Sequence, residues 1–315
     1  MADTAHEPLF DKVAFIGIGL IGSSLARAIR RDNVARHIAV CARTQKSLDA
    51  STRLGFADST SLDPAEVAKD ADLVILCSHL GTYPEIAPKV GPALKPGAIL
   101  SDVGSAKQAA IRDLGPYVPE GVHFVPGHPV SGTEFSGPEA GFAELFEDRW
   151  TILTPPPGTD QDAVDKVAEM WRRAGSMVEI MEAKHHDQVM AMTSHLPHLI
   201  SYTIVGTATD LETSLKNEVI KFSAGGFRDF SRIAASDPIF WRDVFLNNRE
   251  AVLEVLQRFS EDLTALQRAI RWGEADTLQE RFTRAREIRR GVIDAKQDTP
   301  PIPPGAETAA ETDQA

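Results

Sequence analysis

Short apolar runs alternate with helical patterns through the first half of the chain. Most runs are four to six residues long, and helices or loops of a dozen or more residues separate them, which is typical of βαβ units. Because crossovers between parallel strands are right-handed, the pattern predicts an α/β fold with an N-terminal Rossmann-type doubly wound sheet over residues 10–182. The predicted strands cover residues 13–17, 37–41, 72–77, 98–103, 122–125, 150–153 and 177–180.

The second half carries helical periodicity and no convincing strand. An apolar helix is predicted from about Lys184 to Leu211, and Pro197 should kink it because proline removes a backbone donor. Ser236-Asp237-Pro238 joins a capping residue to a proline at the first helical position, which marks another helix start. We therefore predict an all-helical C-terminal domain over residues 183–297 and a disordered, Pro-rich tail over residues 298–315.

A stripe of apolar residues follows this start signal at intervals of three and four positions. It predicts a helix of more than about thirty residues, whose apolar face so small a domain cannot bury unaided. A homodimer formed through the helical domain is the simplest cover, and packing against the first domain is the alternative. The stripe consists of Val252, Val255, Leu256, Phe259, Leu263, Leu266 and Ile270.

Charge and cysteine content exclude several classes of protein. The net charge is −12, which argues against nucleic-acid binding because phosphate contacts need clustered Lys and Arg. Cys41 and Cys77 lie inside apolar runs and indicate neither a disulfide framework nor a metal site. With no apolar run long enough for a membrane span and no secretory signal, we expect a cytoplasmic protein that does not bind membranes.

A glycine-rich turn follows the first predicted strand. The sequence there is Gly17-Ile18-Gly19-Leu20-Ile21-Gly22, and a helix follows it. Gly17 permits the tight turn, Gly19 lets a pyrophosphate approach the backbone, and Gly22 lets the helix pack on the strand. Since the helix also presents free N–H groups to phosphates, the motif predicts a dinucleotide site that includes Leu20 and Ile21. Ser78, which follows the third predicted strand, is assigned to the same site.

The end of the second predicted strand faces the adenosine ribose in such folds. NAD-binding proteins place Asp or Glu there, whereas this strand ends in Cys41-Ala42-Arg43-Thr44-Gln45-Lys46 and has no carboxylate before Asp49. Arg43 can contact a 2′-phosphate, and Thr44 can assist. The sequence therefore favours NADP over NAD. The alternative is that Arg43 stacks on the adenine and serves NAD equally well.

Two later strand ends carry candidate catalytic residues. In open α/β sheets, ligands bind outside the carboxyl ends of the strands, where Ser105 and His128 are predicted to lie. A histidine is the natural base for removing a hydroxyl proton near neutral pH, so His128 is the candidate base. Ser105 is expected to hold its other ring nitrogen. The alternative is a structural histidine.

A cluster in the helical half supplies candidate substrate contacts. Arg228 and Arg232 lie four residues apart after Gly225-Gly226, which places both on one helical face. Such a pair suits a substrate carboxylate, because arginine binds it through two hydrogen bonds. The alternative is surface salt bridges to Asp229 or Asp237.

Four histidines lie in a single stretch of the helical half. They lack a ligand signature such as HExxH, so no metal is predicted, and a role for one of them in a substrate pocket is the better interpretation. They are His185, His186, His195 and His198.

Together these motifs resemble the prephenate/arogenate dehydrogenase family, also called cyclohexadienyl dehydrogenases. The resemblance extends over roughly residues 12–295. Five motifs carry it in order: GIGLIG at 17–22, DVGSAK at 102–107, GHPVSGTE at 127–134, SHLPH at 194–198 and GGFRDFSRIAASDPIFW at 225–241.

The resemblance implies a Rossmann domain joined to a helical dimerisation domain, and roles for particular residues. His128 corresponds to the catalytic base and Ser105 to its hydrogen-bond partner. Arg232 corresponds to the binder of the substrate carboxylate and Arg228 stands where some members have lysine, which leaves the choice between a keto and an amino side chain open. The remaining implied substrate contacts are His198, Glu134 and Thr133.

The implied reaction is the oxidative decarboxylation of prephenate, arogenate or both, in tyrosine biosynthesis. Two rival functions remain: a β-hydroxyacid-type dehydrogenase, whose base is typically a lysine, and a non-enzymatic NAD(P)-sensing regulator. Lys184 is the best lysine for the first rival, but it lies outside any clear motif.

Overall fold

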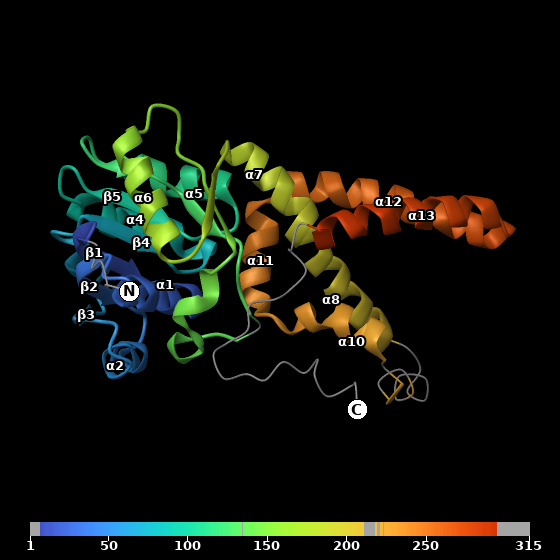
Figure 1. Cartoon of the computed structure of the whole chain (residues 1–315), viewed down its shortest axis with the longest axis horizontal. Coiled ribbons are helices and arrows are strands. Elements are labelled where there is room, and N and C mark those ends of the chain that lie inside the picture. The colour runs from blue at the N-terminus through green and yellow to red at the C-terminus, as the bar shows by residue number, and fades with distance from the viewer. Residues whose placement is uncertain (1–6, 134, 211–217, 219–220, 223, 295–315) are drawn as a thin grey trace, which may run out of the picture.

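The structure is a computed structural model that describes residues 7–133, 135–210, 218, 221–222 and 224–294. Figure 1 shows an α/β domain joined to a helical part, from which the helices α12 (Arg249–Trp272) and α13 (Ala275–Asp294) project side by side. We call these two helices the arm. Within the described residues, no helix is both long enough and apolar enough to cross a membrane.

The main sheet has six parallel strands in the order β3-β2-β1-β4-β5-β6. This order reverses direction between β1 and β4, as in a doubly wound nucleotide-binding sheet, so the predicted fold class is confirmed. The strands are β1 Phe10–Ile16, β2 Ala35–Cys41, β3 Ser59–Ser61, β4 Leu73–Leu76, β5 Ile99–Asp102 and β6 His123–Phe124.

Helices cover both faces of this sheet, and the alternation of side chains along β1 explains why. Val13 and Phe15 belong to one buried cluster, whereas Ala14 and Ile16 belong to the other. Because successive strand residues point to opposite faces, an apolar strand must be covered on both sides. The covering helices are α1 Leu20–Arg31, α2 Gln45–Arg53, α3 Pro64–Ala68, α4 Tyr83–Val90, α5 Lys107–Leu114 and α6 Gln161–Arg173.

A second, three-stranded sheet corrects the sequence prediction. The segments 150–153 and 177–180 were predicted to extend the parallel sheet, but they form β8 (Trp150–Leu153) and β9 (Met177–Ile180) beside β7 (Gly127–Pro129). β7 runs antiparallel to β8. The ladder of the first sheet ends before β7 because the next N–H that faces β5, that of Gly127, donates to the side chain of Asp102 and not to a backbone carbonyl.

The helical part contains no strand within the described residues, as predicted. The predicted kinked helix is α7, a π-helical turn and then α8, with Pro197 in the first turn of α8. The prediction of one helix longer than about thirty residues is wrong, because Asn248 separates α11 from the 24-residue α12. The new helices are α7 Ala183–Met190, the π-helical turn Ala191–His195, α8 Leu196–Thr209, α10 Gly225–Ser231 and α11 Pro238–Asn247.

Candidate active site

The glycine-rich turn has the geometry that its sequence predicts. Gly17 has φ +98°, and a Cβ there would lie 2.7 Å from the backbone nitrogen of Ser78. A Cβ on Gly22 would lie 2.8 Å from the carbonyl oxygen of Gly17. Gly19 caps α1 without a side-chain hydrogen bond, and Leu20 and Ile21 open the helix with no acidic residue in its first turn. The backbone N–H groups of this turn therefore suit a phosphate.

The loop between β2 and α2 carries the predicted ribose contacts. The side chain of Arg43 is exposed, and no ion pair to it is found among the described residues. The Thr44 hydroxyl caps α2 by accepting a hydrogen bond of 3.3 Å from the backbone N–H of Ser47. The loop thus offers a guanidinium and no neighbouring carboxylate partner within the part that the structure describes.

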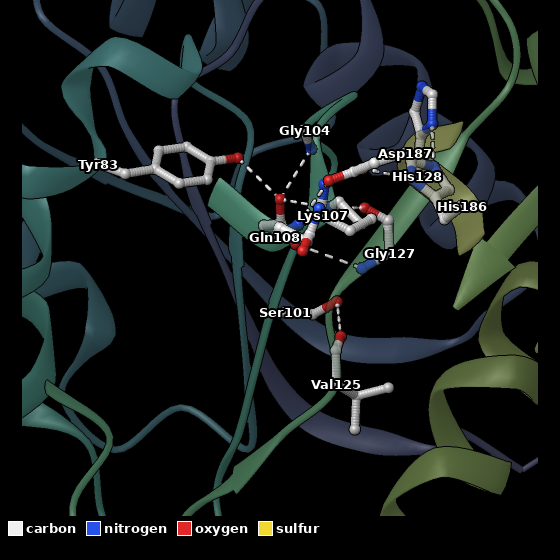
Figure 2. Close-up of polar contacts among 11 residues, drawn as sticks. Tyr83, Ser101, Gly104, Lys107, Gln108, Val125, Gly127, His128, His186 and Asp187 are labelled. Carbon is white, nitrogen blue, oxygen red and sulfur yellow. Dashed lines mark hydrogen bonds and ion pairs between the residues drawn. The ribbon is translucent and has the colours of Figure 1, made fainter. Parts of the chain in front are cut away.

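His128 lies on β7 and is buried, with 8% of its surface exposed. Its Nδ1 lies 2.8 Å from Nε2 of His186, and Nδ1 of His186 lies 2.8 Å from Oδ1 of Asp187. The Asp187 carboxylate also accepts hydrogen bonds from the backbone N–H groups of Lys107 (2.7 Å) and Gln108 (3.0 Å). Figure 2 shows these residues in one chain of contacts that leads from α5 to His128.

Burial shifts the pKa of each group in this chain. Burial, together with neighbouring His186, Lys107 and His195, holds the pKa of His128 well below its ordinary value of 6.5. Burial also lowers the pKa of His186, against the opposing hydrogen bond to Asp187. For Asp187, burial would raise the pKa, but hydrogen bonds from His186 and from the α5 backbone hold it below 3.8. At neutral pH the two imidazoles are therefore neutral and the carboxylate is ionised.

A buried ion pair fixes the strand ends on either side of His128. Nζ of Lys107 lies 2.8 and 2.7 Å from the two oxygens of Asp102 and donates to the carbonyl oxygen of Gly127. The Tyr83 hydroxyl and the N–H of Gly104 also donate to Asp102. Since a buried charge is tolerated only when it is paired and hydrogen-bonded, this network locks β5, α5 and β7 together (Figure 2).

Ser105 does not make its predicted hydrogen bond. The Ser105 hydroxyl oxygen is buried and has no hydrogen-bond partner in the part of the chain that the structure describes. His186 occupies Nδ1 of His128, so the expected Ser105–His128 contact is absent and His186 takes its place. A role for the Ser105 hydroxyl toward a substrate stays a prediction.

Part of the predicted substrate site comes together around Trp241. The ring of His198 stacks on Trp241 with centroids 3.6 Å apart, and its Nδ1 lies 2.8 Å from the carbonyl oxygen of Ser194. Burial and the charge of nearby Arg232 lower the pKa of His198 to about 4. The structure therefore brings His198 and Arg232 close enough to interact electrostatically.

Other predicted substrate contacts are less well placed. Arg228 is exposed and pairs with Asp229 at 3.0 Å, as the alternative interpretation of the arginine cluster expected. The Thr133 hydroxyl accepts a hydrogen bond from the N–H of Phe135. Glu134 lies outside the described residues.

His195 and Asn248 form a further buried pair that sequence reasoning did not assign. The side-chain amide of Asn248 lies 3.1 Å from Nδ1 of His195 and donates to the carbonyl oxygen of Asp187 at 2.8 Å. Burial lowers the pKa of His195 to about 4. Asn248 therefore ties the start of the arm to the helix that carries His186 and Asp187.

Sequence reasoning also missed His186, Asp187, Lys107 and Asp102 as site residues. His186 was one of four histidines of which one was expected to line a substrate pocket, and no contact with His128 was predicted for it. Within the described residues, no three His, Cys, Asp or Glu side chains form a metal site. One signal in the sequence could have found them. His186 and Asp187 lie in the helix that follows the last strand, and Lys107, the last residue of the DVGSAK motif, donates its backbone N–H to Asp187.

Comparisons with known proteins cover both halves of the chain. Residues 25–180 match the family model described as prephenate dehydrogenase, nucleotide-binding domain, and residues 182–284 match the one described as prephenate dehydrogenase, dimerization domain. A cyclohexadienyl dehydrogenase of Zymomonas mobilis is 39% identical over 281 residues, which cover 89% of this chain and 96% of that protein.

Two solved structures are similar over the same length. Prephenate dehydrogenase from A. aeolicus, in complex with hydroxyphenyl propionate and NAD+, aligns with a TM-score of 0.82 and 34% identity, covering 90% of this chain and 98% of its own. Arogenate dehydrogenase from Synechocystis aligns with a TM-score of 0.75 and 25% identity, covering 89% and 99%.

Proposed function

Because the chain belongs to the prephenate/arogenate dehydrogenase family, we propose that it catalyses the oxidative decarboxylation of prephenate, arogenate or both in tyrosine biosynthesis. The observation that carries this proposal is the buried, neutral imidazole of His128, held on β7 by contacts from both domains. A neutral histidine in a preorganised site is suited to accept a hydroxyl proton.

The residues fit the proposed reaction step by step. The glycine-rich turn would hold a nicotinamide dinucleotide, which would supply the acceptor for the hydride on C4 of the cyclohexadienol ring. As the C4 carbonyl forms, His128 takes the hydroxyl proton. The bond from C1 to the carboxylate breaks, carbon dioxide leaves, and its electron pair completes the aromatic ring while the C4 carbonyl becomes a phenolate oxygen, which takes a proton back to give the phenol. The protonated carbonyl is strongly acidic, so even an imidazole of lowered pKa can accept its proton.

We assign substrate binding to Arg232 and His198, with Thr133, Glu134 and Arg228 as further candidates. Arg232 is the proposed carboxylate binder because its charge acts on the partly buried ring of His198. The carboxylate that is lost must not be held more tightly in the ground state than in the transition state, since only differential binding accelerates the reaction.

For the cofactor we propose NADP ahead of NAD. The support is the exposed guanidinium of Arg43 and the absence of Asp or Glu between Cys41 and Leu48. The A. aeolicus relative was solved with NAD+, so NAD remains the competing cofactor.

We also propose that the chain forms a homodimer through its helical domain. The arm projects away from the α/β domain (Figure 1), so packing of the apolar stripe against that domain does not cover it. Light scattering at micromolar concentration should give twice the chain mass, and a monomer would contradict the proposal. Exposed apolar residues along the arm are Leu253, Leu263, Ile270, Trp272, Phe282 and Ile288.

One assay tests the proposed activity. The protein is mixed with NADP or NAD and with prephenate or arogenate, and the absorbance of reduced nicotinamide is followed. Turnover with at least one of the four combinations is expected. No turnover with any of them would overturn the proposal and reopen the two rivals, a β-hydroxyacid-type dehydrogenase and an NAD(P)-sensing regulator, neither of which the relatives favour.

A further inference from the structure

Two side chains from the helical domain form a chain of contacts that ends at His128. Its Nδ1 contacts His186, and His186 contacts Asp187, each over 2.8 Å (Figure 2). We propose that His186 and Asp187 are positioning residues that hold the hydrogen of neutral His128 on Nδ1 and leave Nε2 as the atom that accepts the substrate proton. The inference rests on the proposed function for the identity of that proton, but the tautomer itself can be measured without substrate.

Two backbone donors fix the ionisation state of the Asp187 carboxylate. The backbone N–H groups of Lys107 and Gln108 can only donate, and both point at its oxygens. A carboxylate that receives such hydrogen bonds stays ionised and can only accept. The remaining contact of Asp187, to Nδ1 of His186, must therefore be a donation from the imidazole.

The donor and acceptor roles of the His186 ring nitrogens in turn fix those of His128. A neutral imidazole carries one hydrogen, so a hydrogen on Nδ1 of His186 leaves Nε2 as an acceptor. A 2.8 Å contact between two ring nitrogens requires one hydrogen between them, which must then come from Nδ1 of His128. Neutral His128 consequently keeps its lone pair on Nε2.

The same contacts also stabilise the protonated form of His128. When Nε2 of His128 takes the hydroxyl proton, the imidazolium still donates from Nδ1 to His186, and the Asp187 carboxylate lies next along the chain. The ionised Asp187 opposes the unfavourable charge of Lys107, which also faces this site. Nε2 then gives the proton back to the phenolate oxygen that decarboxylation leaves on the product, while Nδ1 keeps its hydrogen bonded to His186.

A purely structural role for the pair is the competing explanation. Asp187 supplies the first turn of α5 with side-chain acceptors that its own N-cap residue, Ala106, lacks. If that were its whole role, the ring contacts would not affect the tautomer of His128. A test must therefore measure the tautomer or the chemical step, as well as the stability.

Nitrogen NMR of protein carrying labelled histidine measures the tautomer directly, and comparison with His128→Asn identifies the His128 signals. We expect hydrogen on Nδ1 and an unprotonated Nε2 at neutral pH in the wild-type protein without substrate. A wild-type His128 with its hydrogen on Nε2 would overturn the proposal. Because this measurement needs no turnover, it stands even if neither prephenate nor arogenate proves to be a substrate.

Two substitutions at His186 distinguish the effect of its hydrogen-bond directions from the effect of the space that its side chain fills. In His186→Gln, the amide N–H can donate to Asp187 while the amide oxygen accepts from Nδ1 of His128, so polarity is kept. In His186→Leu both contacts are lost, and kcat should fall roughly 10²-fold or more, as expected when a general base is mispositioned. His186→Gln should recover at least about tenfold of that loss, with the His128 hydrogen still on Nδ1.

His185 provides the matched control, because it is the neighbouring residue and its side chain is exposed. His185→Gln should leave kcat unchanged. Cofactor affinity and the unfolding midpoint report folding for every variant. A His186→Leu protein with wild-type kcat would overturn the proposal, as would equal kcat for His186→Leu and His186→Gln when both bind cofactor normally. If His186→Leu does not fold, the wild-type tautomer and the His186→Gln kinetics still decide.

Discussion

The two halves of the molecule differ in how completely each buries its own apolar surface. The α/β domain encloses two large clusters, one on each face of its main sheet. Among the described residues, the corresponding buried cluster of the helical part consists of Ala191, Ala251 and Val252, and most of the exposed large apolar side chains lie in that part. A domain with so little core of its own depends on other surfaces for stability. The α/β domain is one such surface, and a second copy of the chain is the other that we propose.

The candidate site lies where the two halves meet. His128, Lys107 and the N-terminus of α5 come from the α/β domain, whereas His186 and Asp187 come from α7. The hydrogen bonds that organise the proposed base therefore form only when the two domains are packed together. Folding of the α/β domain alone would supply the nucleotide site without an oriented base.

The largest expected effect follows from replacing the base. His128→Asn should lower kcat by roughly 10²–10⁴ and leave cofactor affinity unchanged, because the amide cannot accept a proton at neutral pH. Steady-state kinetics and cofactor titration measure the two quantities. A kcat near that of the wild type would remove His128 from the mechanism and would place the chemistry elsewhere in the site.

The pH profile of the wild-type enzyme sharpens the same point. Only neutral His128 can act as the base, so protonation abolishes activity as the pH falls through its pKa. Because burial holds that pKa well below 6.5, kcat/KM should stay constant down to pH values below the ordinary range of histidine. A fall in kcat/KM on the acid side with its midpoint above pH 6.5 would contradict the lowered pKa of His128.

Asp187→Ala should produce the next largest effect, this time on stability. The change leaves His186 and two α5 N–H groups without their acceptor, and breaking a buried charge interaction in this way costs about 3–5 kcal/mol. Urea unfolding at a fixed protein concentration measures the loss. Asp11→Ala, which removes an exposed ion pair with Arg36, is the control and should cost at most about 1 kcal/mol. Equal losses would mean that Asp187 does not join the domains.

The sequence predicted the parts of the site that are continuous along the chain. The strand, turn and helix around GIGLIG stand as expected, because three glycines at that spacing permit only a few backbone arrangements. The separate sheet of β7, β8 and β9 was missed, since apolar runs do not reveal which strand pairs with which. The His186 contact was missed for the same reason: it joins residues 58 positions apart across two domains.

Arg232→Ala tests whether the helical half binds the substrate carboxylate. Losing one charge-assisted contact to a carboxylate should cost about 1.5–3 kcal/mol of substrate binding, so KM for the substrate should rise while cofactor affinity stays constant. Arg258→Ala, an exposed arginine on the arm, is the control. An unchanged KM for both prephenate and arogenate would exclude Arg232 as a binder and would leave His198 without its proposed companion.

The smallest expected effect concerns the α/β domain alone, at Arg43. An acid after β2 would accept from the 2′-hydroxyl of NAD and repel the 2′-phosphate of NADP, and no acid stands between Cys41 and Leu48. A guanidinium contact to the phosphate is worth about 1.5–3 kcal/mol, or roughly ten- to a hundredfold in affinity. We therefore expect a lower KM for NADP than for NAD, and Arg43→Ala should erase the difference by weakening the binding of NADP.

Arg36→Ala, at the opposite end of β2, is the control. It should leave both KM values unchanged, because Arg36 lies away from the strand end that faces the ribose. If Arg43 instead stacks on the adenine, Arg43→Ala should weaken both cofactors equally, since the adenine is common to them. A wild-type preference for NAD, or equal losses for the two cofactors, would therefore show that this loop does not select the phosphate.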